Sequence, residues 1–171
     1  MRLFIAIPSA DTWHSDFAMS VVQMNQTIYS NPFEEDMGLS IVNRRGSIIQ
    51  DSREKLVEEA LEKEATHILF LDSDMVFPHD ACHRLMAHDL PAVACNYVQR
   101  IIPANPNAKD VNGQVMYTYP DSEGLEEAAS AGFGVSLFKA EIFQMLSKPW
   151  FDCVWMNDGR LVGEDVFLFR K

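Results

Sequence analysis

The stretch that most constrains the fold of this chain is residues 66–78, which read THILFLDSDMVFP. Four consecutive apolar residues, 68–71, run directly into Asp72 and Asp74, with one serine between the two acids. A short unbroken apolar run favours a strand that is buried on both faces, as in a parallel sheet covered by helices. If the extended backbone continues through the acidic pair, side chains two residues apart point the same way. We therefore expect the two carboxylates to converge at the carboxyl end of a buried strand.

Two carboxylates in one small volume repel each other unless a cation lies between them, and hard divalent ions prefer such oxygen ligands. In open α/β sheets, ligands bind outside the carboxyl ends of the strands. The stretch therefore predicts a metal–phosphate site, with Asp72 and Asp74 as the metal ligands.

The length and charge of the chain narrow the class of protein. We expect its 171 residues to form a single domain with a substantial core. The formal net charge of −11 argues against non-specific nucleic-acid binding, which needs a basic surface. The three cysteines form no zinc-binding spacing, so we expect free thiols in a reducing compartment. No stretch is long enough to span a bilayer, and the opening MRLFIAIPS predicts a strand and not a signal peptide. We expect a cytoplasmic protein.

Apolar spacing predicts alternating strands and helices along most of the chain. The expected strands are residues 3–7, 39–42, 68–71, 91–98 and 135–138. The expected helices are residues 12–28, 47–64, 79–89 and 140–147, the first of them capped by Asp11 or Thr12. Residues 100–131 are rich in proline and glycine and contain Asn112-Gly113, so we expect an extended excursion with a β-hairpin. This order of elements is typical of an α/β fold.

One charged residue lies where the second helix should be apolar. At roughly 100° per residue, Arg53 falls near the centre of an arc that includes Leu56, Val57 and Ala60. A charge there is costly unless it is paired, and the start of this helix lies beside the carboxyl ends of the strands. The position indicates either a side chain that extends past the sheet edge to solvent or a contact to a bound anion.

Motifs near the end of the sequence have both a structural and a functional interpretation. Gly132 and Gly134 flank one phenylalanine, which indicates close backbone approach to a ligand or to another strand. The aromatic residues of 149–151 (Pro-Trp-Phe) and Trp155 indicate core packing or stacking on a sugar ring. Residues 163–165 (Gly-Glu-Asp) open an apolar helix, which indicates either a dipole-favoured helix start or a general base aimed into a site.

Taken together, these residues resemble the GT-A-fold glycosyltransferases, in particular family-2-like enzymes of bacteria and bacteriophages. The resemblance rests on the strand ending at Pro8, the Arg53 helix, and the motifs LFLDSDMVFP, GFG, PWF and GEDV in this order. It spans nearly the whole chain. The fold it implies is a Rossmann-like three-layer α/β sandwich with a mostly parallel central sheet and a β-hairpin excursion.

The resemblance implies transfer of a sugar, with inversion, from a UDP- or GDP-type nucleotide-diphospho-sugar to a hydroxyl of a saccharide or other acceptor. It implies that Asp72 and Asp74 hold a Mn²⁺ or Mg²⁺ ion that bridges the two phosphates. It also implies that Asp165 is the base that deprotonates the acceptor hydroxyl, with Glu164 in a supporting role. The residues it assigns to nucleotide-sugar binding are Pro8, Ser9, Asp11, Arg53, Asp72, Ser73, Gly132 and Gly134.

Members of this family usually continue past the Gly-Glu-Asp helix, often to a histidine that completes metal binding, whereas this sequence stops at Lys171. We therefore expect a single domain that is shortened at its C-terminal end or has lost part of its site. One alternative is a non-catalytic nucleotide or nucleotide-sugar binder on the same scaffold. A less favoured alternative is a haloacid-dehalogenase-type phosphatase with Asp72 as its nucleophile, although such enzymes normally carry this motif near the N-terminus.

Overall fold

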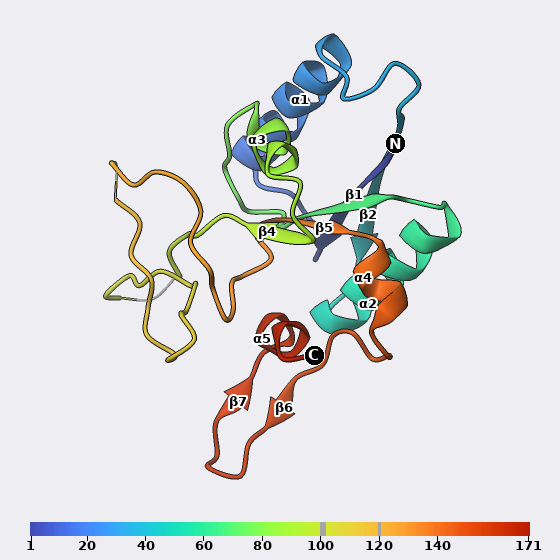
Figure 1. Ribbon diagram of the computed structural model, residues 1–171. Coiled ribbons are helices and arrows are strands. Elements are labelled where there is room, and N and C mark those ends of the chain that lie inside the picture. The colour runs from blue at the N-terminus through green and yellow to red at the C-terminus, as the bar shows by residue number, and fades with distance from the viewer. Residues whose placement is uncertain (100–101, 120) are drawn as a thin grey trace.

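The centre of the fold is a five-stranded sheet in a computed structural model that describes residues 1–99, 102–119 and 121–171. The strands lie in the order β2-β1-β3-β5-β4. Their bounds are Arg2–Ser9 (β1), Gly38–Arg45 (β2), His67–Leu71 (β3), Ala92–Ala94 (β4) and Val135–Lys139 (β5). The strand that precedes the acidic pair, β3, therefore lies in the middle of the sheet (Figure 1).

The sheet is mixed. β1 pairs in parallel with both β2 and β3, whereas β5 pairs antiparallel with both β3 and β4. Within this sheet β4 consequently runs in the direction of β3, and β5 alone runs the other way. The prediction of an α/β chain is confirmed, and the expectation of a mostly parallel sheet holds for every one of these strands except β5.

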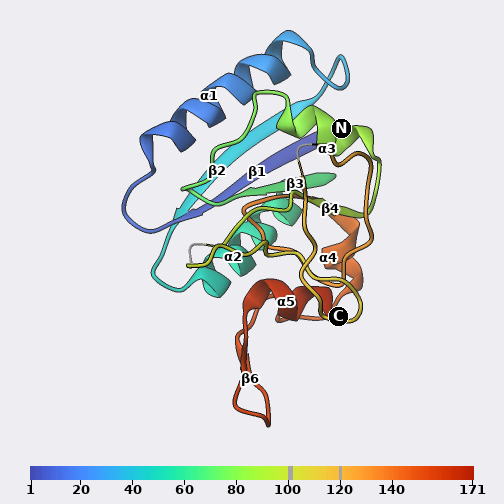
Figure 2. The same ribbon diagram turned by 90° about the vertical axis from the view of Figure 1, so that its left-hand side faces the viewer.

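Helices cover both faces of the sheet (Figure 2). The helices of one face are α1 (Ser15–Ser30) and α3 (Ala81–Ala87), and those of the other are α2 (Ile49–Glu62), α4 (Glu141–Met145) and α5 (Glu164–Phe169). Alternate residues of β1 enter the two cores: Ile5 packs with the α1 side and Phe4 with the α2 side. This alternation is what a strand buried on both faces requires. In the part of the chain that the structure describes, no helix combines the length and apolar character needed to cross a bilayer.

The first helix begins later than its apolar spacing predicts. Its N-cap residue is His14, which makes no side-chain cap hydrogen bond, so the prediction that Asp11 or Thr12 caps the helix is wrong. The Asp11 carboxylate instead binds the guanidinium of Arg45 at 2.9 Å, and the N–H of His14 donates to the carbonyl of Ser73 at 3.1 Å. The residues before α1 therefore join the ends of neighbouring strands instead of capping the helix.

The hairpin predicted at Asn112-Gly113 is a tight turn without a regular ladder. Gly113 has a φ of 78°, and its N–H donates to the carbonyl of Asp110 at 3.0 Å. The residues on either side form isolated antiparallel bridges and not strands. Arg100 and Pro120, which belong to the predicted excursion, lie outside the described residues.

A second hairpin, which the sequence pattern did not predict, precedes α5. Its strands, β6 (Val154–Trp155) and β7 (Leu161–Val162), pair antiparallel, and the hairpin projects from the body of the molecule (Figure 1). The Trp155 side chain is 71% exposed, whereas Trp150 and Phe151 are buried. Of the two interpretations of these aromatic residues, core packing therefore holds for Trp150 and Phe151.

Candidate functional site

Arg53 joins the two acidic motifs of the chain. Its Nη2 donates to Oδ1 of Asp72 at 2.8 Å, and its Nη1 donates to Oε1 of Glu164. These partners lie 19 and 111 residues away in the sequence. The guanidinium carbon lies 4.9 Å from the ring centre of Phe133. Both acidic motifs therefore meet on one cation at the carboxyl end of β3.

The helical position of Arg53 explains its burial. α2 buries Leu56, Val57 and Ala60, and Arg53 lies on the same side of the helix at the spacings that share a helix face. The Arg53 side chain is only 4% exposed, which rules out the interpretation that it extends past the sheet edge into solvent. Its Nε is buried without a hydrogen-bond partner among the described residues. The charge is thus held inside the protein by the carboxylates of Asp72 and Glu164, with the Phe133 ring beside it.

The acidic stretch forms a turn and does not continue the strand. β3 ends before Asp72, and the N–H of Met75 donates to the Asp72 carbonyl at 3.1 Å. The expectation that Asp72 and Asp74 project from an extended backbone is therefore wrong. A hydrogen bond of 3.0 Å from the Asp72 N–H to the carbonyl of Gly134 fixes the start of the turn. The Asp72 carboxylate faces Arg53, and Ser73 and Asp74, both half-buried, follow in the turn.

The Gly-Glu-Asp motif opens α5, as the sequence predicts. Gly163 is the N-cap residue, and Glu164 and Asp165 occupy the first turn, where acidic residues are favoured by the helix dipole. Oε1 of Glu164 accepts a hydrogen bond from Arg53, and its Oε2 lies 3.8 Å from the sulfur of Cys153. The first turn of α5 is therefore held both by the helix dipole and by the ion pair between Glu164 and Arg53.

Asp165 has a different environment from Glu164. Its Oδ1 accepts the N–H of Val166 at 2.7 Å. Burial raises the pKa of the Asp165 carboxyl, because the charged form is poorly solvated, and this outweighs the opposing effect of that hydrogen bond. The carboxylate of Asp165 is therefore more basic than that of an exposed aspartate.

Tyr97, which sequence reasoning missed, lies against the two glycines. Its hydroxyl accepts the N–H of Gly134 at 3.0 Å. A Cβ atom on Gly134 would lie 2.7 Å from the Tyr97 ring, and one on Gly132 would lie 2.2 Å from its hydroxyl. The predicted close approach at these glycines is confirmed, and the group that lies against them in the structure is the Tyr97 side chain. Tyr97 lies within the ordinary apolar run 91–98, so nothing in the sequence distinguishes it.

The environment of Tyr97 keeps its hydroxyl protonated. Burial raises the pKa of Tyr97 to about 12, and the nearby charge of Asp72 acts in the same direction. The phenol thus remains neutral beside the acidic cluster at physiological pH.

The residues predicted after the first strand border a separate hollow. Asp11 and Arg45 line a cavity of about 370 Å³. The hydroxyl of Ser9 accepts a hydrogen bond of 2.7 Å from Asn43, which holds the end of β1 against β2, where Pro8 is also paired. In the described part of the chain, no hydrogen bond or ion pair found for these β1 residues reaches Arg53. The predicted site residues therefore fall into two groups, one at the end of β1 beside this cavity and one around Arg53.

A glycine connects this hollow with the Arg53 cluster. Gly46 lines the cavity, and a Cβ atom on it would lie 2.5 Å from the hydroxyl of Ser52. Ser52 directly precedes Arg53 in α2. The wall of the cavity therefore contacts the start of α2 one residue before Arg53.

No protein-family model matches the sequence, and no curated protein matches it. Among solved structures, 21 chains match. One of them is the crystal structure of A197 from STIV, with a TM-score of 0.64 and 19% sequence identity, covering 99% of this chain and 77% of that chain. At this level of identity the likeness shows a shared fold and no shared activity.

Proposed function

We propose that this protein is a metal-dependent glycosyltransferase of the GT-A type, which moves a sugar from a nucleotide-diphospho-sugar to an acceptor hydroxyl with inversion. The observation that carries the proposal is the meeting of Asp72 and Glu164 on Arg53 at the carboxyl end of β3. In open α/β sheets this edge is where ligands bind. The order of the sequence motifs and the α/β architecture support the same scaffold.

The charge of the cluster favours a divalent cation. Arg53 brings one positive charge among the carboxylates of Asp72, Glu164 and Asp165. Among residues 1–99, 102–119 and 121–171, no group of three or more His, Cys, Asp or Glu is arranged to hold an ion alone. In nucleotide sites, however, Mg²⁺ usually takes only one or two carboxylates and completes its coordination with phosphates and water. The residues fit an ion that enters together with a diphosphate.

We assign Asp72 and Asp74 as the residues that would hold such a Mn²⁺ or Mg²⁺ ion. The bound ion would neutralise the charge that develops on the departing diphosphate. Arg53 orients the Asp72 carboxylate through the hydrogen bond of 2.8 Å, and Gly134 fixes the backbone of the same residue. The protein's part is therefore to hold the carboxylates in place before the donor arrives.

The nucleotide of the donor is assigned to the cavity of about 370 Å³ beyond β1. Its walls carry the carboxylate of Asp11 and the guanidinium of Arg45, which can hydrogen-bond a base or a ribose. Gly46 of this cavity packs against Ser52, which precedes Arg53 in α2, so we place the phosphates of a bound UDP or GDP on the side of the cavity that faces Arg53. Pro8 and Ser9 would support its wall from the strand side.

Asp165 is assigned as the general base. The raised pKa of its carboxyl brings it closer to neutral pH, which improves proton transfer from an acceptor hydroxyl. Its Oδ2 would take this proton, since Oδ1 accepts the N–H of Val166. The acceptor oxygen would then attack the anomeric carbon as the bond to the diphosphate breaks. Glu164 would keep the first turn of α5 in place through Arg53.

Product analysis with a panel of UDP- and GDP-sugars in Mn²⁺ tests this function. The wild-type protein should release sugar and nucleotide diphosphate slowly in water and faster with an acceptor. Asp165→Asn should lower turnover by about 10²-fold or more and leave nucleotide affinity unchanged, whereas Asp158→Asn, on the exposed hairpin loop, should change neither. Nucleotide binding without turnover of any donor would support the non-catalytic binder. Phosphatase activity lost in Asp72→Asn, without nucleotide affinity, would support the phosphatase.

A further inference from the structure

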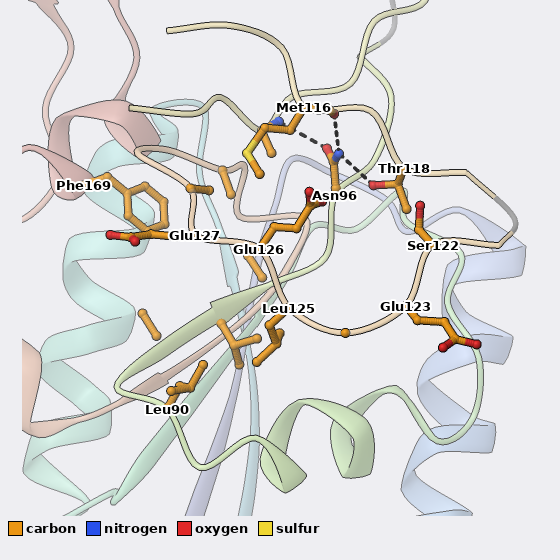
Figure 3. Close-up of a pocket in the computed structure, with 17 residues that line it drawn as sticks. Leu90, Asn96, Met116, Thr118, Ser122, Glu123, Leu125, Glu126, Glu127 and Phe169 are labelled. Carbon is orange, nitrogen blue, oxygen red and sulfur yellow. Dashed lines mark hydrogen bonds between the residues drawn. The ribbon is translucent and has the colours of Figure 1, made fainter. Parts of the chain in front are cut away.

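A cavity of about 650 Å³ lies along β4 (Figure 3). This volume is in the range of ligand-binding sites in proteins. Its lining includes all three residues of β4, Phe169 of α5, and the loop of residues 122–128. In Figure 3 this loop crosses over the sheet and carries Ser122 to Glu127 on the far side of the cavity from β4.

The cavity follows the edge of β4 and not one face of the sheet. Val93 packs with the core on the α1 side, and Ala92 packs with the core on the α2 side. Since neighbouring residues of a strand point to opposite faces, lining by three consecutive residues is typical of a cavity that borders the strand edge. In the described chain β4 pairs with β5 only, so its other edge faces the cavity.

The backbone groups of Ala92 and Ala94 point toward this open edge. In an antiparallel ladder, every second residue bonds to the neighbouring strand. The carbonyl of Pro91 and the N–H of Cys95 each bond to β5 at 2.9 Å. Residues 92 and 94, which alternate with them, therefore direct their N–H and C=O groups away from β5. Such an unpaired edge is a template for a further strand.

The chain covers the residues after β4 but not β4 itself. The N–H of Asn107 donates to the carbonyl of Tyr97 at 2.9 Å. The side-chain amide of Asn96 donates to the carbonyl of Met116 at 2.7 Å, which fixes the loop that borders the cavity. Across the described ranges no comparable backbone bond reaches the open edge of residues 92–94. The hydrogen bonds of Asn96 and Tyr97 therefore hold the segment after β4 in place, and the open edge of β4 can pair with a further strand.

The charged residues that line the cavity are all acidic. They are Glu123, Glu126 and Glu127, and the described lining contains no lysine, arginine or histidine. Much of the remaining lining is apolar and includes Leu125 and Phe169. An extended segment with apolar side chains and flanking lysine or arginine residues complements both properties.

We propose that this cavity binds an extended basic segment of a partner polypeptide, which adds to the sheet as a strand beside β4. The backbone groups of Ala92 and Ala94 supply the main-chain hydrogen bonds. The apolar lining takes alternate side chains of the segment, and the three glutamates select lysine or arginine at its ends. This site needs no nucleotide or metal, so it does not depend on the proposed transferase activity.

Fluorescence anisotropy with the labelled peptide Lys-Leu-Thr-Leu-Lys tests the proposal on the full chain. The expected result is saturable binding with a Kd below about 1 mM, weakened as the salt concentration rises. The same peptide with N-methylated backbone amides should bind at least about tenfold more weakly, because it cannot pair with a strand. The peptide Glu-Leu-Thr-Leu-Glu should not bind. Equal affinity for the basic and N-methylated peptides, or no saturable binding of the basic peptide, would overturn the proposal.

Two matched pairs of variants locate the binding site. Ala94→Pro removes the outward N–H without touching the ladder to β5, and it should abolish peptide binding, whereas Ala94→Ser should retain it. Replacing Glu123, Glu126 and Glu127 by glutamine should weaken binding by about tenfold, and the distant pair Glu35→Gln/Glu62→Gln should not. Circular dichroism checks that each variant is folded. Unchanged binding in a folded Ala94→Pro protein would contradict strand pairing at β4.

Discussion

Arg53 and Asp72 form an ion pair of 2.8 Å between the start of α2 and the end of the central strand. The arginine side chain is 4% exposed and the aspartate 27% exposed, so water screens this pair only in part. Glu164 binds the same guanidinium from α5. The arrangement therefore ties three elements together at the edge of the sheet where we place the donor, and removing its one cation affects both stability and function.

Replacing Arg53 by glutamine should lower the free energy of unfolding by about 3 kcal/mol, because two carboxylates would remain close together without their partner. Urea denaturation followed by circular dichroism measures this change. Arg53→Lys should cost less, since it keeps the charge but loses the two-pronged geometry.

Arg45→Gln is the matched control. Arg45 also pairs with an aspartate, Asp11, at 2.9 Å, but both side chains are largely exposed. Its loss should change the free energy of unfolding by less than about 1 kcal/mol. Equal effects of the two substitutions would show that the Arg53 cluster contributes no more to stability than an exposed ion pair.

The sequence was sufficient to place Arg53 among the apolar residues of its helix, because helical periodicity is local, but it did not predict the two carboxylates that bind this side chain. It was not sufficient for the conformation of residues 72–74. Their turn is fixed by a backbone hydrogen bond from Asp72 to Gly134, which directly precedes β5 and is too distant in the sequence to leave a local signal. The same holds for Tyr97, whose partners are distant glycines.

The short strands of the fold differ from the sequence prediction in length or were not predicted. The apolar run 91–98 predicts a longer strand, but the ladder ends at Ala94, because the partner strand β5 begins at Val135, whose carbonyl accepts the N–H of Cys95. The two-residue strands of the β6–β7 hairpin are too short for any alternation to be recognised. The sequence therefore predicts β4 as part of too long a strand and misses the β6–β7 hairpin.

Asp165→Asn should stabilise the fold at neutral pH. Burial raises the pKa of Asp165 above 3.8 in the folded protein, so the folded state holds this proton more tightly than the unfolded chain does. The contribution of this group to stability is therefore present below pH 3.8 and is lost as the pH rises through the folded pKa. Asparagine cannot ionise, so the variant does not lose stability as the pH rises, and its Tm at pH 7 should be about 1–3 °C above that of the wild type.

The pH dependence separates this effect from ordinary changes of charge. The difference in Tm between Asp165→Asn and the wild type should vanish toward pH 3.8 and grow toward neutral pH. For the control Asp158→Asn the sign is opposite, because a hydrogen bond from Arg160 lowers the pKa of Asp158. A wild-type protein that is more stable than Asp165→Asn at pH 7 would contradict the assigned environment.

Gly134→Ala should destabilise the protein by about 1–3 kcal/mol, because the new methyl group would lie 2.7 Å from the Tyr97 ring. Thermal unfolding measures the cost. In a Tyr97→Ala background the same substitution should cost much less, since the obstructing ring is gone. Gly38→Ala, whose Cβ would meet its nearest neighbour at 3.4 Å, should be tolerated. Equal costs in both backgrounds would place the strain elsewhere.

The three thiols should react with Ellman's reagent in the order Cys153, Cys95, Cys82. Burial raises the pKa of Cys82 to about 12, and its side chain is inaccessible in the core. Cys153 is half-buried and lies 3.8 Å from Glu164, so UDP or GDP with Mn²⁺ should slow its reaction specifically. Cys153→Ser should remove the fast phase. A nucleotide effect on Cys82 with none on Cys153 would argue for a ligand site elsewhere.

Calorimetric titration of UDP and GDP, with and without Mn²⁺, tests most directly whether the acidic turn after β3 holds a metal ion together with the donor. We predict saturable binding of one nucleotide that requires Mn²⁺, is lost in Asp74→Ala and is retained in Asp165→Asn. Failure of both nucleotides to bind in Mn²⁺, or unchanged binding in a folded Asp74→Ala protein, would contradict the account.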